Sequence, residues 1–224
     1  KISFDQKPYR KFMMETFGAK CNPSPSNLTD FGKKLISENS DNPGSLGIAI
    51  SEAIEATVKS GGKAKYSLGS VLGHVLMHQT INGNEALLQM EMADDYPDII
   101  VGCTGGGSNL SGLMFPFLGQ QLRGGKKIDI IGCEPLSCPS FTKGKYAYDH
   151  GDMARMTPLI KMHTLGSDFL PPANHSGGLR YHGMSYHLSH LYDLGLMRAK
   201  AYGQKDCFEA GVIFGKQEGI IPAP

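Results

Sequence analysis

The sequence predicts an α/β protein with three layers, in which helices cover both faces of a mostly parallel sheet. Two observations predict this class. A strand, a glycine turn, a helix and a second strand follow one another between residues 98 and 133, as in a βαβ unit. The chain also has 224 residues, of which 40% are hydrophobic, and this is enough apolar material to bury a core. In such folds, ligands bind at the carboxyl ends of the strands.

Two helices are predicted in the N-terminal third of the chain. Asn27 or Thr29 is placed to cap the first helix, which continues to about residue 36. Ser45 precedes the second helix, in which apolar residues recur at helical spacing over residues 46–58. The pair Gly61-Gly62 then supplies the left-handed backbone that ends a helix.

The βαβ unit is the clearest pattern in the sequence. Residues 98–103 contain a continuous apolar run, which predicts a central parallel strand covered on both faces. Residues 107–122 predict a helix that Pro116 should distort and that Gly124-Gly125 ends. Residues 128–133 predict a second buried strand. The predicted inward positions of the helix are Leu110, Leu113, Met114 and Leu118.

The remaining third of the chain has weaker patterns. Residues 141–175 are rich in Gly, Pro, Met and Thr without a regular period, so we expect a long, loop-bearing segment. Residues 206–217 predict a last helix.

Composition excludes several classes of function. The net charge is +1 with 19% charged residues, which is too little positive charge for nonspecific nucleic-acid binding. The apolar runs are far shorter than the roughly 20 residues that span a membrane. The five cysteines show no paired spacing and predict a reducing cytoplasm. The chain lacks an initiator methionine and stops directly after an apolar run, so we expect an interior fragment of a longer enzyme.

A glycine-rich loop follows the first predicted strand. Gly105, Gly106, Gly107, Ser108 and Asn109 lead directly into the predicted helix, so their N–H groups and the positive helix end converge on one point. This predicts a binding site for a phosphate monoester. The loop matches neither the P-loop nor the dinucleotide-binding pattern. The alternative is a tight turn that is rich in glycine.

Four motifs together resemble tryptophan synthase β chains, in particular their second, divergent type. They occur in the same order and spacing as in that family, and the resemblance covers essentially the whole chain. The motifs are Gly105 to Asn109, Cys133-Glu134-Pro135, Gly178 to Gly183, and Glu218 to Ala223. The resemblance implies fold type II of the pyridoxal-phosphate (PLP) enzymes. It also implies that residues 1–66 belong to a mobile, communication-type lobe and that residues 67–224 form the domain that binds the PLP phosphate.

The resemblance implies roles for individual residues. The glycine loop, Gly105 to Asn109, would hold the cofactor phosphate. Gly69 and Ser70 would lie beside the cofactor ring oxygen. For Ser70 the alternative is a helix cap before a helix over residues 71–80.

The segment that begins at Gly178 would flank the indole pocket. The carbonyls of Leu179, Tyr181 and Gly183 would bind a monovalent cation. The better-known β chains have an aspartate where Arg180 stands, so this arginine would pair with a different group, such as the substrate carboxylate. The alternative for Arg180 is a surface salt bridge.

The family's catalytic lysine lies in a His-Lys-x-Asn motif upstream of this sequence, so the resemblance implies no catalytic residue in this chain. The intact enzyme would condense L-serine with indole as a PLP-dependent homodimer. The sequence leaves open whether an α-type partner subunit binds it. Alternatives are another type II lyase, such as a cysteine or threonine synthase, and a non-catalytic phosphate-binding module.

Overall fold

The computed structural model describes residues 1–172 and 178–222, and it divides into two compact units. The first unit comprises Lys1–Ser67, His150–Leu159 and Ser167–Ala173. The second comprises Leu68–Asp149, Ile160–Gly166 and Asn174–Pro224. The end of the predicted 141–175 segment and Ala223 of the last motif lie outside the described residues.

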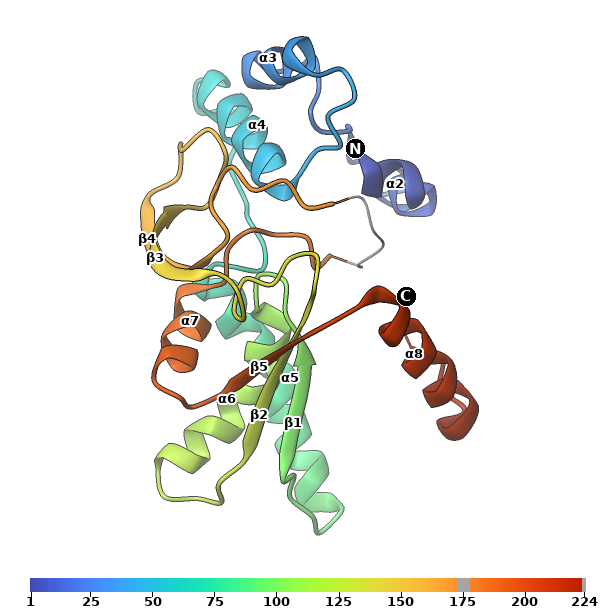
Figure 1. The fold of residues 1–224 in the computed structure, drawn as a ribbon, viewed down its shortest axis with the longest axis vertical. Coiled ribbons are helices and arrows are strands. Elements are labelled where there is room, and N and C mark those ends of the chain that lie inside the picture. Colours follow the sequence, from blue (N-terminus) through green and yellow to red (C-terminus); the bar gives the residue numbers. More distant parts are fainter. Residues whose placement is uncertain (173–177, 223–224) are drawn as a thin grey trace. The chain divides into compact units, whose positions relative to one another are not determined.

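Helices build the N-terminal part of the first unit (Figure 1). They are α1 (Ile2–Gln6), α2 (Pro8–Thr16), α3 (Asp30–Glu38) and α4 (Leu46–Lys59). The predicted cap by Thr29 is confirmed, because Thr29 Oγ1 accepts a hydrogen bond from Gly32 N–H at 3.0 Å. Ser45 also caps its helix, since its Oγ accepts a hydrogen bond from Ile48 N–H at 3.1 Å. Gly61 has a φ of +61°, which confirms the predicted left-handed backbone after α4.

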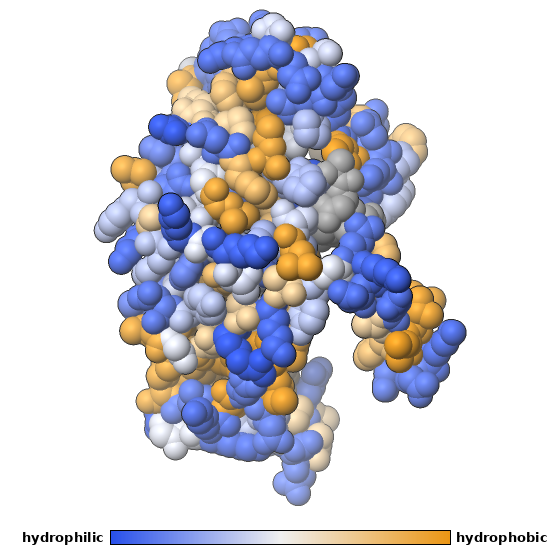
Figure 2. Space-filling model, in the orientation of Figure 1, coloured by the Kyte–Doolittle hydropathy of each residue, from blue (hydrophilic) through white to orange (hydrophobic). Residues whose placement is uncertain are grey.

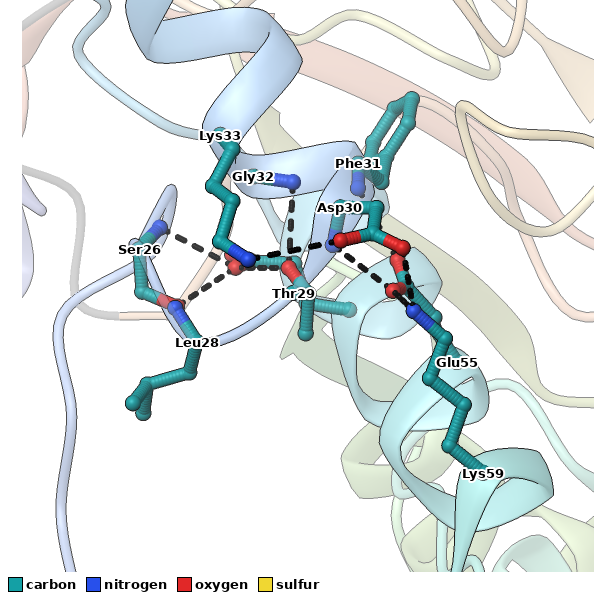
Figure 3. Close-up of polar contacts among 10 residues, drawn as sticks. Ser26, Leu28, Thr29, Asp30, Phe31, Gly32, Lys33, Glu55 and Lys59 are labelled. Atoms are coloured by element: carbon teal, nitrogen blue, oxygen red, sulfur yellow. Dashed lines mark hydrogen bonds and ion pairs between the residues drawn. The ribbon is translucent and has the colours of Figure 1, made fainter.

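Two glutamates of α4 hold the start of α3. Glu52 is buried and accepts hydrogen bonds from Ser26 N–H at 3.0 Å and from Thr29 Oγ1 at 2.7 Å. One turn later, Glu55 accepts hydrogen bonds from the first two N–H groups of α3 at 2.7 and 3.0 Å (Figure 3). Lys59 donates to Glu55 at 2.6 Å. The two N–H bonds to Glu55 satisfy donors at the start of α3 that have no partner within that helix.

Asp152 connects the 150–159 segment to α4 within the same unit. Its side chain has no exposed surface, and its carboxylate accepts hydrogen bonds from Ser51 Oγ at 2.7 Å and from Thr157 N–H at 2.9 Å. Burial acts to raise the pKa of Asp152, but hydrogen bonds from Thr157, Ser51 and Met156 outweigh burial and hold the pKa below its ordinary value.

The second unit contains a parallel sheet with the strand order β1-β2-β5 (Figure 1). The strands are β1 (Ile99–Cys103), β2 (Asp129–Pro135) and β5 (Arg198–Tyr202). Helix α6 (Ser108–Leu122) connects β1 to β2, which pair in parallel, so the predicted βαβ unit and the α/β class with a parallel sheet are confirmed. The other helices of this unit are α5 (Gly73–Met92), α7 (Tyr186–Asp193) and α8 (Gln204–Glu218). Among the described helices, none combines the length and the apolarity that a bilayer crossing requires.

The core of the second unit lies between α6 and one face of the sheet. Three of the predicted inward residues of α6 are buried, and the fourth, Leu113, is partly buried. They pack with Ile100 of β1, Ile130 of β2 and Leu188 of α7. Helix α5 packs closely against α6 at Gly112, where there is no room for a side chain. A Cβ at this position would lie only 2.5 Å from the carbonyl oxygen of Gln79.

The prediction that the first strand is covered on both faces was wrong. Strand β1 lies at the edge of the described sheet, and Ile99 and Val101 are each 55% exposed. Alternate side chains of a strand point to opposite faces, so Ile100 faces α6 whereas Ile99 and Val101 point away from it. A continuous apolar run cannot indicate which of its two faces a helix covers.

The loop-bearing segment predicted over residues 141–175 also contains two strands that the sequence patterns did not indicate. Strands β3 (Lys145–His150) and β4 (Leu159–Thr164) form a separate two-stranded sheet. Side chains connect the two strands: Lys161 Nζ lies 4.3 Å from the centre of the Tyr146 ring, and Thr164 Oγ1 donates to Asp149 at 2.6 Å. Such cross-strand pairs form only when the two strands lie side by side. Neither strand alone shows the regular alternation of apolar and polar residues that would predict a strand.

Candidate phosphate-binding site

The glycine loop lies where the sequence predicts it, between β1 and α6. Gly107 is the N-cap of α6 with a φ of +104°, a left-handed backbone that favours glycine, and it provides no side-chain cap. Thr104 N–H donates to the carbonyl of Cys133 at 2.7 Å and so fixes the loop to the end of β2. The first N–H groups of a helix have no intrahelical partner, so this uncapped end is suited to an anion.

Neighbouring segments pack so closely on the loop that side chains larger than glycine do not fit. A Cβ at Gly105 would lie 2.7 Å from the carbonyl oxygen of Gly178, and a Cβ at Gly106 would overlap Ser70 Oγ. The structure therefore brings Gly105, Gly106, Ser70 and Gly178 together, as expected for parts of one site.

Ser70 does not cap a helix. Helix α5 begins at Gly73, its N-cap is Leu72, and no side chain caps it. The capping alternative was therefore wrong, and the hydroxyl of Ser70 lies against the glycine loop instead. Gly69 is exposed and has open space around it.

Ser185 is a residue of this site that sequence reasoning missed. Its N–H donates to the carbonyl of Gly106 at 3.0 Å, and its side chain is only 1% exposed. A Cβ on Gly107 would lie 3.2 Å from Ser185 Oγ, which has no hydrogen-bond partner among the described residues. A buried hydroxyl without a partner is costly, so a bound oxygen acceptor would relieve the cost. No local pattern around residue 185 indicates this role.

Asn109 differs from the other residues of the loop. Its side chain is exposed, and its amide lies 3.8 Å from Cys103 Sγ, to which it donates. Ser108, in contrast, is buried in the first turn of α6.

The segment after Gly178 is attached to the end of β4. The carbonyl of His182 accepts a hydrogen bond from Leu165 N–H at 2.8 Å, and Met184 N–H donates to the carbonyl of His163 at 2.9 Å. These two bonds flank Gly183, which forms an isolated antiparallel bridge with Thr164.

Arg180 is partly buried beside Cys138. Burial raises the pKa of the Cys138 thiol to about 12, although the positive charge of Arg180 acts in the opposite direction. Glu134 of the Cys133-Glu134-Pro135 motif is buried and accepts N–H hydrogen bonds from Phe141 and Thr142, both at 2.8 Å. Its carboxylate thus holds the turn that follows β2.

Comparisons with known proteins show which proteins this sequence resembles. The sequence is 56% identical over 224 residues to tryptophan synthase beta chain 2 of Thermotoga maritima, which covers 100% of this chain. It is 54% identical over 224 residues to the protein of the same name from Aeropyrum pernix and 53% identical to that from Pyrococcus furiosus. Over its whole length, the chain is a homologue of the second type of tryptophan synthase β chain. The match covers 53% of the Thermotoga maritima protein and 50% of the other two, so the chain spans about half the length of these relatives.

A solved structure shares the fold of this chain. The crystal structure of a threonine deaminase from T.th. matches with a TM-score of 0.58 and 15% sequence identity. The match covers 95% of this chain and 56% of the deaminase. The chain therefore has the architecture of the fold type II PLP enzymes. No family model matches the sequence.

Proposed function

We propose that this chain is the phosphate-binding part of a PLP-dependent tryptophan synthase β chain, which joins L-serine and indole to form L-tryptophan by β-replacement. The observation that carries this proposal is the glycine loop at the uncapped start of α6, which lies against Ser70 and the buried, unpartnered hydroxyl of Ser185. Homology to proteins named tryptophan synthase beta chain supports the reaction.

The residues present fit the phosphate group of PLP. The N–H groups from Gly105 to Asn109 and the positive end of α6 would bind its charge, and Ser185 Oγ would donate a hydrogen bond to a phosphate oxygen. Ser70 and Gly69 would lie beside the ring. When bound, PLP supplies the electron sink for exchanging the β-substituent of an amino acid. Gly178 and Arg180 would border the substrate, and the guanidinium would pair with the serine carboxylate.

Binding of a phosphate ester tests the proposal directly. Deoxypyridoxine phosphate lacks the aldehyde and therefore avoids nonspecific reactions with surface lysines. Isothermal titration should show that the chain binds it at least about tenfold more tightly than deoxypyridoxine, because only the phosphorylated compound reaches the loop. Equal affinities would exclude the phosphate site.

The reaction itself is expected to need more than this chain. We infer that the lysine that binds PLP covalently belongs to the part of the relatives that this chain does not match. The chain incubated with serine, indole and PLP should therefore yield no tryptophan, as measured by chromatography. Formation of tryptophan would contradict this inference while leaving the phosphate site intact.

We add three finer proposals. The carbonyls of Leu179, Tyr181 and Gly183 would bind a monovalent cation, so potassium should raise the melting temperature more than a bulky organic cation does. The intact enzyme would be a homodimer, which light scattering would measure. We also place it in the cytoplasm, because all five cysteines are free thiols.

A further inference from the structure

Two cysteines stand next to each other on neighbouring strands of the parallel sheet. Cys103 at the end of β1 is the register partner of Cys133 on β2, and Cys133 is in turn the register partner of Lys200 on β5. Residues in register on parallel strands point to the same face of the sheet. The three residues therefore form a row across the sheet.

This row lies on the face of the sheet opposite to α6. The preceding residues, Gly102 and Gly132, face α6, since a Cβ on either would contact the side chain of Leu110. Side chains alternate along a strand, so Cys103 and Cys133 point the other way. Cys103 is exposed and Cys133 is partly buried.

The spacing of the two cysteines is suitable for a disulfide. Adjacent strands are about 4.8 Å apart, and disulfides join Cα atoms that are roughly 4.4–6.8 Å apart. The hydrogen bond of 2.7 Å from Thr104 N–H to the carbonyl of Cys133 holds the strand ends together at this level. Both cysteines are free thiols in the structure.

Electrostatics also indicates that the thiols are close. Burial raises the pKa of Cys133, and the neighbouring sulfurs of Cys103 and Cys207 raise it further, while Lys200 and Arg198 act in the opposite direction. Two adjacent thiolates repel each other, whereas a disulfide removes both charges. Cys207 lies in the first turns of α8 and is the competing thiol.

We propose that Cys103 and Cys133 form a redox-responsive thiol pair that a peroxide converts into an intrachain disulfide. Hydrogen peroxide would oxidise the exposed Cys103 to a sulfenic acid and release one water. The sulfur of Cys133 would then attack the Cys103 sulfur, so that the S–S bond forms, the S–O bond breaks and a second water leaves. Two thiols are thus oxidised and one peroxide is reduced. A thiol reductant would reverse the change, as for the redox-sensing disulfides of reducing compartments.

The test is oxidation of the reduced chain with hydrogen peroxide at equimolar concentration, followed by alkylation under denaturing conditions and peptide mass mapping. Two of the five cysteines should escape alkylation, and the cross-linked peptides should contain Cys103 and Cys133. Trypsin leaves Cys133 and Cys138 in one peptide, residues 128–143, so variants must tell them apart. The cross-link should persist in C138S and C207S, and it should disappear in C103S and C133S.

Other outcomes would overturn the proposal. These are a cross-link that includes Cys138 or Cys207, a cross-link between two chains, or oxidation of single cysteines without any cross-link. Circular dichroism of each variant checks that it is folded, and C133A serves as a second variant if C133S is not. A dithiol reductant should restore all five alkylatable thiols in the oxidised wild type.

Discussion

Ser185 combines burial with an unused hydroxyl. Its Oγ is buried without a partner among the described residues, beside a loop whose N–H groups are suited to an anion. Burying a hydroxyl without a partner costs roughly 1–3 kcal/mol in proteins. A buried hydroxyl without a partner indicates a role other than stabilising the fold. The position of Ser185 beside the glycine loop favours binding of a phosphate oxygen.

Replacing Ser185 by alanine should therefore weaken binding but not folding. We expect Ser185→Ala to lower the affinity for deoxypyridoxine phosphate roughly tenfold or more, since a hydrogen bond to a charged acceptor contributes about 1.5–3 kcal/mol. The free energy of unfolding without ligand should stay the same or rise slightly. Titration calorimetry and urea unfolding measure the two quantities.

Ser189 provides the matched control. It is fully buried, but its Oγ accepts a hydrogen bond from His163 N–H at 2.9 Å. Ser189→Ala should lower the free energy of unfolding by about 1–2 kcal/mol and leave the affinity unchanged. If Ser185→Ala bound the phosphate compound as well as the wild type, Ser185 would have no part in the site.

Asp152 makes the stability of the first unit depend on pH. Its pKa is lowered in the folded chain, so its contribution is complete above the ordinary carboxyl pKa of about 4 and is lost as the pH falls through the lower, folded-state pKa. Asp152→Asn should lower the free energy of unfolding by about 1–3 kcal/mol at pH 7. The difference from wild type should shrink at pH 3, as urea unfolding at both pH values would show.

Asp168 is the control for this prediction because it is 71% exposed and paired with Arg155 at 3.3 Å. Asp168→Asn should change the free energy of unfolding by less than about 0.5 kcal/mol. A pH-independent effect of Asp152→Asn would show that its charge does not contribute.

At the scale of elements, β1 shows how a strand of the sheet is buried on one side. Ile100 is 5% exposed and packs with α6, whereas its neighbour Val101 is 55% exposed.

Helix α8 carries exposed hydrophobic side chains, which Figure 2 shows in orange; they include Phe208, Val212 and Ile213. No residue of α8 is buried.

The two faces of β1 should respond differently to truncation. Ile100→Ala should lower the free energy of unfolding by about 2–4 kcal/mol, because it leaves a cavity against α6. Val101→Ala should change it by less than about 0.5 kcal/mol. Similar losses in urea unfolding would mean that both faces of β1 are covered in solution.

At the scale of the whole molecule, the chain divides into two compact units, and the first unit includes the later segments His150–Leu159 and Ser167–Ala173. Cooperative unfolding belongs to units with their own packed core. Substitutions within one unit are therefore expected to affect the unfolding of that unit.

Differential scanning calorimetry tests this division. We expect two transitions, of which Asp152→Asn lowers only one and Leu110→Ala lowers only the other. Leu110 is fully buried in the second unit, so its truncation should cost about 2–5 kcal/mol there. A single transition that both variants shift equally would show that the chain unfolds as one cooperative body.

Several features were predictable from the sequence because they depend on residues close together in the chain. Thr29 and Ser45 cap helices within three residues of themselves, and the strand, glycine loop and helix from β1 to α6 follow one another directly. Helix α6 begins at Ser108, one residue after the predicted start. The four motifs in their order and spacing were also sufficient to indicate the family.

Only the tertiary structure decided which distant groups meet. Glu52 binds Ser26 and Asp152 binds Ser51, pairs separated by 26 and 101 residues, and Ser185 reaches a loop that lies far earlier in the chain. The covered face of β1, the pairing of β3 with β4 and the row that includes Cys103 and Cys133 were likewise set by packing. Hydrogen bonds and burial depend on distance in space, whereas a sequence pattern reports only distance along the chain.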